Sequence, residues 1–180
     1  MSIQLTEREQ QAIKFEAYPP AQEILGVWTQ PLKKHYGDNG AFMEYARLNA
    51  TGHTNGTPTP LHAQQISVSW AEPARINAFH VHTKVPQDEI WTVIAGQLTV
   101  WLVDCRENSP TGGHKRKHQL SGEQPTQLHI PAGVAHGYRA GQQGATLIYT
   151  MNQHFNPSDP NEGRLPWNWF GEELWDEDKG

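Results

Sequence analysis

Short runs in which apolar and polar residues alternate dominate the chain, and Gly, Pro and Asn residues separate them. Alternation with a period of two is typical of strands that bury one face, and the separating residues are typical of turns. The segments predicted as strands on this pattern are 41–48, 64–70, 76–82, 90–95, 98–103, 127–130 and 145–151. Many short strands with frequent turns favour a sandwich or a barrel, so we expect an all-β fold.

The clearest local pattern is the segment WTVIAGQLTVWLV, residues 91–103. Two runs rich in β-branched and aromatic residues flank Gly96 and Gln97, a pair suited to a tight turn. The pattern predicts a hairpin at this place.

Both ends of the chain differ from this strand pattern. A short helix is predicted over residues 6–17, within an N-terminal helical segment 1–20, because Thr6 and Glu9 have the spacing of a capping box. The tail of residues 166–180 is rich in Trp among acidic residues. We expect this tail to plug one end of the barrel or to cover a partner subunit.

Length, composition and charge narrow the class of protein. With 180 residues, 36% of them hydrophobic, the chain can bury one substantial core, so a single domain over residues 1–180 is expected. A net charge of −5 argues against nucleic acid as a partner, and the basic cluster at 112–118 is interpreted as a solvated loop. The apolar stretches are too short to span a bilayer, and the N-terminus lacks the apolar core of a signal peptide. We therefore expect a cytoplasmic protein without a membrane partner.

The candidate chemistry lies in the histidines, of which the chain has ten. His80 and His82 stand two residues apart on a predicted strand, so both imidazoles project from the same face. Glu89 lies at the start of the next predicted strand, and a tight turn made by Pro and Gly residues precedes His136. The spacing indicates that neighbouring strands bring a carboxylate and a third imidazole beside the histidine pair.

These residues, with Gly96, Pro131 and Gly133, resemble the two signature motifs of metal-binding cupins, although six residues separate His82 from Glu89 where that pattern has three or four. Three imidazoles and one carboxylate suit a divalent transition metal with one or two open positions. The resemblance therefore predicts a metal cofactor (Fe, Mn, Ni, Co, Cu or Zn) held by His80, His82, Glu89 and His136. The alternative is that these are ordinary polar residues at the mouth of a barrel.

A second resemblance covers nearly the whole chain. It rests on YGDNGAFMEY (36–45), NAFHVH (77–82), VDCRENSPTGG (103–113), IPAGVAHGY (130–138), IYTMNQHFNP (148–157) and EGRLPWNW (162–169). In order and spacing these segments are similar to the dTDP-4-dehydrorhamnose 3,5-epimerase family of the cupin superfamily. That resemblance implies a jelly-roll homodimer that works without metal, with His80 as catalytic base and Tyr149 as catalytic acid.

Several functional positions of that family differ in this chain. Asn39 and Asn77 stand where the family has arginines, His82 where it has glutamine, and Glu89 where it has lysine. Phe155 replaces the second family tyrosine, and Asn168 or Trp169 the aspartate that pairs with the base. A diphosphate needs cationic or backbone donors, so the lost arginines argue against the usual nucleotide sugar. A carboxylate at position 89 would also oppose the negative charge that epimerisation builds beside a ketone, whereas a metal would restore a positive centre.

Three functions remain open from the sequence. The first is a metal-binding cupin enzyme of isomerase, epimerase or oxygenase type, acting on a small carbonyl or sugar-like molecule. The second is a metal-independent epimerase with an altered substrate, centred on His80 and Tyr149, although Tyr149 could instead cap the barrel core. The third is a non-catalytic cupin whose small-molecule pocket is walled by Trp70, Trp91 and Trp101.

Overall fold

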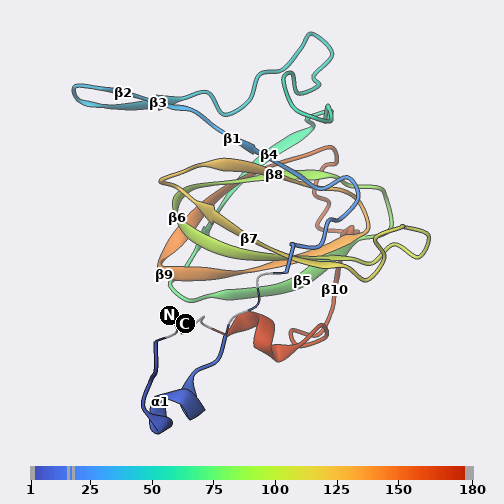
Figure 1. Ribbon diagram of the computed structural model, residues 1–180. Helices are drawn as coiled ribbons and strands as arrows, with labels where there is room; N and C mark the ends of the chain where they lie inside the picture. The colour runs from blue at the N-terminus through green and yellow to red at the C-terminus, as the bar shows by residue number, and fades with distance from the viewer. Residues whose placement is uncertain (1–2, 16, 18, 177–180) are drawn as a thin grey trace.

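Antiparallel strands are the main regular structure of the molecule, as the computed structural model shows for residues 3–15, 17 and 19–176 (Figure 1). The elements are α1 (Glu7–Ala12), β1 (Trp28–Pro31), β2 (Lys34–Gly37), β3 (Gly40–Met43), β4 (Gln65–Ala71), β5 (Ile76–His82), β6 (Glu89–Asp104), β7 (Lys115–Ser121), β8 (Thr126–Ile130), β9 (Val134–Met151), β10 (Glu162–Arg164) and a 3-10 helix (Glu172–Trp175). The predicted all-β fold with one short N-terminal helix is confirmed.

Two long strands, β6 and β9, pair with each other along almost their whole length and hold the barrel together. Residues 89–96 of β6 and 145–151 of β9 lie with β4, β8 and β1. Their other halves lie with β5, β7 and β10. Each long strand therefore contributes to both walls of the barrel (Figure 1).

The hairpin predicted around Gly96 is wrong, because β6 continues through this point in one direction. Gly96 has a φ of 69°, and the pairing of β6 with β9 shifts register on both sides of it. A Cβ at this position would lie 2.0 Å from the carbonyl oxygen of Gly144, so glycine is required for the close approach. A glycine in the left-handed conformation suits a tight turn, but at position 96 it bends a continuous strand.

The N-terminal helix is shorter than predicted. Thr6 caps it as expected, with its hydroxyl accepting a hydrogen bond from the Glu9 amide, but the helix ends at Ala12. None of its residues is buried, and a helix without a packed face is only marginally stable beyond a turn or two. Residues 1, 2, 16 and 18 of the predicted helical segment lie outside the described residues.

Two further segments differ from the prediction. Only the first part of 41–48 is a strand, β3, which pairs with β2 in a hairpin that projects from the barrel in Figure 1. The basic cluster at 112–118 is not wholly a loop, because residues 115–118 begin β7. His118 in this cluster is buried while Lys117 beside it is exposed, so a basic run can also form a strand with one buried face.

The core has two parts. The larger cluster lies between the two walls and includes Val93 and Leu98 of β6 and Leu128 of β8. The smaller one contains Phe79 and Trp175, whose rings lie 5.1 Å apart. Trp175 thus packs as expected for the tail, whereas Trp169 is 63% exposed, and residues 177–180 of the tail lie outside the described residues.

None of the helices formed by the described residues has the length and apolar character that crossing a membrane would require.

Candidate functional site

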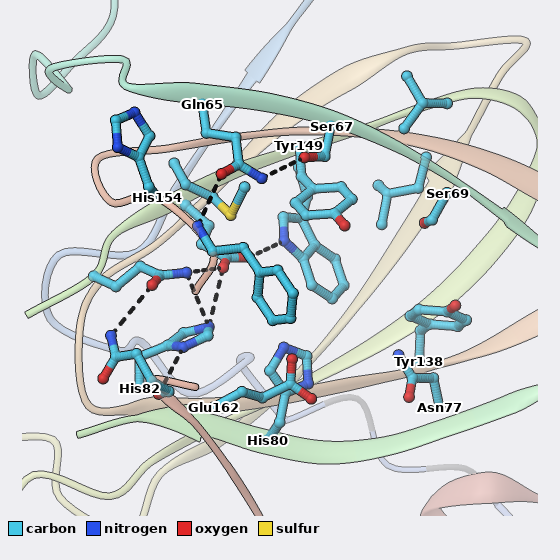
Figure 2. A pocket seen from close by; sticks show the side chains of 18 of the residues that line it. Gln65, Ser67, Ser69, Asn77, His80, His82, Tyr138, Tyr149, His154 and Glu162 are labelled. Carbon is cyan, nitrogen blue, oxygen red and sulfur yellow. Dashed lines mark hydrogen bonds and ion pairs between the residues drawn. The ribbon is translucent and has the colours of Figure 1, made fainter. Parts of the chain in front are cut away.

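A cavity of about 580 Å³ opens into the barrel, and side chains from β4, β5, β6, β9 and β10 line it (Figure 2). His80, His82, Glu89 and Tyr149 are among them. The cavity is therefore the place where most of the predicted site residues meet.

The alternation of β5 positions the first histidine pair. His80 and His82 are 6% and 7% exposed and face the cavity, while Phe79 is fully buried in the smaller core cluster. His136 of β9 lies opposite His80 in the strand register. This confirms that the two-residue spacing places both imidazoles on one face.

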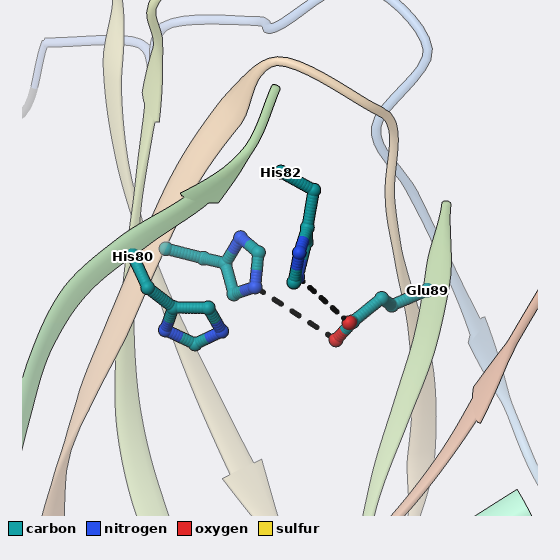
Figure 3. Close-up of side chains that lie close together, drawn as sticks. His80, His82 and Glu89 are labelled. Atoms are coloured by element: carbon teal, nitrogen blue, oxygen red, sulfur yellow. Dashed lines mark ion pairs between the residues drawn. The ribbon is translucent and has the colours of Figure 1, made fainter. Parts of the chain in front are cut away.

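The four predicted ligands converge, with one potential ligand atom of each lying within 4.8 Å of the others. The rings of His80 and His136 are 4.0 Å apart. The carboxylate of Glu89 faces His82 (Figure 3), and its Oε2 lies 3.7 Å from Nε2 of His136. All four side chains are buried. The sequence therefore predicted this cluster correctly as a spatial arrangement.

Glu89 is a buried carboxylate held by several donors. It accepts hydrogen bonds from Gln87 Nε2 at 2.7 Å and from Trp91 Nε1 at 2.5 Å, and His82 Nε2 lies 3.0 Å from its Oε1. Burial opposes ionisation, but the hydrogen bond from His82 and the surrounding imidazoles outweigh it and lower the pKa of Glu89 to about 2. The carboxylate is therefore ionised at neutral pH.

His82 is the partner of this carboxylate. Its Nδ1 lies 3.1 Å from the carbonyl oxygen of Asn161, and its Nε2 faces Glu89. Burial lowers the pKa of His82, but the hydrogen bond and the charge of Glu89 raise it above its ordinary value. Two acceptor oxygens facing the two ring nitrogens favour the doubly protonated imidazolium.

His80 has the opposite character. Burial and the neighbouring His136 place its pKa well below the ordinary value, so the imidazole is neutral at neutral pH. Its Nδ1 has no hydrogen-bond partner among the residues that the structure describes. A neutral imidazole in a cavity can accept a proton from a bound molecule.

Tyr149 lies on the other side of the cavity from His80 (Figure 2). It pairs with Ser67 of β4 and Trp91 of β6 in the strand register. Burial and the charge of Glu89 raise the pKa of its phenol, and a hydrogen bond with Ser67 only partly offsets the rise. Tyr149 therefore keeps its proton at neutral pH and can donate it.

Glu89→Gln is expected to destabilise the fold by about 3 kcal/mol at pH 7, because it removes an ionised carboxylate that the surrounding donors stabilise in the folded state. The pKa of Glu89 is lowered from 4.5 to about 2 on folding, so its contribution is present above about pH 4.5 and is lost as the pH falls toward 2. Urea unfolding of parent and variant between pH 7 and 2.5 measures the free energy of unfolding of each protein. The difference between the two proteins should shrink with falling pH; a constant difference would contradict the electrostatic explanation.

Other predicted residues lie elsewhere. Asn39, Asn168 and Trp169 do not line the cavity, and neither does Trp101, whose indole donates to the Leu174 carbonyl. Trp70 does line it, but it is 74% exposed. The sequence pattern did not predict a group of polar residues that line the cavity: Arg75, Gln87, Asn161, Glu162 and Arg164. These residues lie in loops or in the three-residue strand β10, where no hydrophobic periodicity marks them.

The fold and the cavity together define a jelly-roll barrel of the cupin type with a histidine-lined pocket. The family described as dTDP-4-dehydrorhamnose 3,5-epimerase matches residues 21–169. The chain is 38% identical to the spore coat polysaccharide biosynthesis protein SpsL of Bacillus subtilis over 146 residues, which is 81% of this chain and 91% of that protein. The chain belongs to the dTDP-4-dehydrorhamnose 3,5-epimerase family.

More distant relatives share the fold. The dTDP-4-dehydrorhamnose 3,5-epimerase of Mycobacterium tuberculosis is 26% identical over 136 residues, which cover 75% of this chain and 66% of that protein. The structure of the Bacillus anthracis epimerase with TDP and PPi bound superposes with a TM-score of 0.71 at 22% identity, covering 86% of this chain and 87% of the other. A second solved structure is a double mutant of ChmJ, a 3'-monoepimerase from Streptomyces bikiniensis, in complex with dTDP. It superposes with a TM-score of 0.69 at 21% identity, covering 88% of this chain and 76% of the other.

The predicted divalent metal cofactor is wrong, because the chain belongs to a family whose members act without metal. The cluster has a physical explanation that needs none. Gln87, Trp91 and His82 surround the Glu89 carboxylate, and the resulting charge pair is buried with its hydrogen bonds made. Histidines and a carboxylate that lie close enough to bind one metal ion can equally form a hydrogen-bonded network without metal.

Proposed function

We propose that the chain is a metal-independent epimerase of a keto sugar carried on a nucleoside diphosphate, with His80 as base and Tyr149 as acid. One observation carries the proposal: a neutral imidazole and a protonated phenol face the same cavity from different walls of the barrel. Membership of the epimerase family supports it independently.

The reaction follows from the chemistry of a carbon next to a ketone. His80 removes the proton from that carbon, and the electron pair moves into an enolate whose charge rests on the carbonyl oxygen. Tyr149 then returns a proton to the same carbon from the opposite side, which inverts its configuration. Base and acid on different walls suit this sequence of steps.

The carboxylate of Glu89 does not forbid this mechanism. Its charge is paired with His82 and shared with the Gln87 and Trp91 donors, so the cluster presents little net negative charge to the enolate. In this proposal the positive centre that the family places at position 89 is supplied by the imidazolium of His82. His80 does not need to bind metal and is free to act as the base.

The names of the relatives narrow the substrate. Several are epimerases of dTDP sugars, and SpsL is named for polysaccharide biosynthesis. We infer a dTDP-linked 4-keto sugar as the first substrate to test, in a pathway that builds a polysaccharide.

The organisation of the protein stays a prediction in three respects: one cupin domain over residues 1–180, a homodimer, and a cytoplasmic location.

The homodimer is supported by the exposed face of β4. Ile66, Val68 and Trp70 alternate along this strand and are 56%, 42% and 74% exposed, and β4 pairs only with β9 among the described strands. An apolar row on a free edge is a natural place for a second copy.

The proposal is tested by incubating the protein with a dTDP-4-keto-6-deoxy sugar and resolving the products by NMR. Formation of an epimer at a carbon adjacent to the ketone is expected. Tight binding of the sugar nucleotide without any turnover would instead favour a non-catalytic binding protein.

A further inference from the structure

The cavity has two ends of different character. In Figure 2, His82 and His154 lie at one end, and Asn77 and Tyr138 lie at the other. The end at His82 borders the buried Glu89 network. The end at Asn77 is the one where the family's arginine is missing.

A guanidinium from another strand occupies this end. Arg164 of β10 donates from Nη1 to Asn77 Oδ1 at 3.0 Å, and its Nη2 lies 2.6 Å from Glu162. Both contacts fix the plane of the guanidinium, which has five N–H donors and so retains some for a ligand. Its side chain is 54% exposed and lines the cavity.

A second guanidinium reaches the cavity from the turn between β4 and β5. Arg75 precedes Asn77 by two residues, and it forms no ion pair with any side chain in the described part of the chain. Its carbonyl accepts from the Ala140 amide at 2.8 Å and its amide donates to the Glu72 carbonyl at 3.1 Å. Ala74 just before it has a φ of 57°, a conformation that costs about 1 kcal/mol in a residue other than glycine. The turn is thus held in one uncommon shape that presents Arg75 at the cavity.

We propose that Arg75 and Arg164 bind the diphosphate of the substrate, in place of the arginine that Asn77 has replaced. This inference rests on the proposed function, because it names the part of a nucleotide sugar that the Asn77 end of the cavity accepts. Guanidinium groups bind phosphate oxygens through paired, charge-assisted hydrogen bonds. Arg75 and Arg164 are the only Arg or Lys residues among those described as lining the cavity.

The arrangement also orients the substrate. With the diphosphate at the Asn77 end, the sugar extends toward His80 and Tyr149. The positive charge of Arg164 also acts on His80. Burial is the main cause of the low pKa of His80, and the charge of Arg164 lowers it further. Glu162 orients Arg164 through their ion pair, but its negative charge also repels a diphosphate. The strength of the Glu162–Arg164 ion pair therefore affects how tightly Arg164 binds the diphosphate.

The test is isothermal titration calorimetry with dTDP, using the full chain and the variants Arg75→Gln, Arg164→Gln and the double variant. Arg8→Gln is the matched control, because Arg8 is a 93% exposed side chain on α1 that does not line the cavity. We expect each single change to weaken dTDP binding about 10-fold or more and the double change about 100-fold or more. The parent affinity should also fall with added salt, more steeply than that of the double variant. Thermal unfolding of each variant checks that the fold is retained.

The outcomes separate this inference from the proposed function. Equal dTDP affinity in the parent and in folded Arg75→Gln and Arg164→Gln would overturn the inference and leave the epimerase intact. If dTDP does not bind to the parent, the inference is also overturned. The proposed function would then be tested separately, by measuring His80-dependent proton exchange in a keto sugar that carries no nucleotide. Binding lost equally in Arg8→Gln would show only a general charge effect and would overturn the assignment to these two arginines.

Discussion

His80→Asn is expected to lower the rate of proton exchange at the carbon beside the substrate ketone by about 10²–10⁴-fold, the usual contribution of a positioned general base. Asparagine has similar size and polarity but cannot accept the proton. His80 is neutral at neutral pH and faces the cavity, so its loss removes the group that starts the reaction. Deuterium uptake from D₂O into a dTDP-4-keto-6-deoxy sugar, followed by NMR, measures the rate.

Two controls define this result. His35→Asn changes an exposed histidine on β2, outside the cavity, and should leave exchange unchanged. dTDP binding to His80→Asn should persist, because the proposed diphosphate site lies at the other end of the substrate. Exchange at the parent rate in a folded His80→Asn protein would rule out His80 as the base.

Tyr149→Phe is expected to separate exchange from inversion. His80 can still remove a proton and return a solvent deuteron to the same face, so exchange should stay within about 10-fold of the parent. Inversion needs a proton from the opposite side and should fall by about 10²-fold or more. Product analysis by NMR in D₂O reports both quantities from one sample.

Tyr138→Phe is the matched control for Tyr149, because Tyr138 is a second tyrosine that lines the cavity. It should retain inversion. If Tyr138→Phe abolished inversion while Tyr149→Phe did not, the acid would be Tyr138 and the present assignment would be wrong.

The strands that the sequence predicted best are those with a clean alternation and one buried face. The prediction for 76–82 coincides with β5, because Phe79 and Val81 face one side and His80 and His82 the other. The hairpin around Gly96 failed because a left-handed glycine serves a turn and a bulge equally well. Which of the two forms depends on pairing with β9, a strand distant along the chain, and no local pattern contains that information.

The candidate site was predicted in its positions but not in its chemistry. The convergence of His80, His82, Glu89 and His136 follows from strand spacing. Whether such a group binds metal or forms a hydrogen-bonded charge pair depends on its neighbours, here Gln87 and Trp91. Arg164 could not be foreseen, because its contact with Asn77 joins residues 87 apart in the sequence.

The most direct test of the central claim is proton exchange by protein freed of metal. The protein is treated with a strong chelator, its metal content is verified by mass spectrometry, and deuterium uptake into a dTDP-4-keto-6-deoxy sugar is followed by NMR with and without added divalent metals. The metal-independent mechanism predicts that exchange and epimer formation proceed at the same rate in the metal-free protein and are unchanged by metal addition. Activity that disappears on chelation and returns with one metal would contradict it.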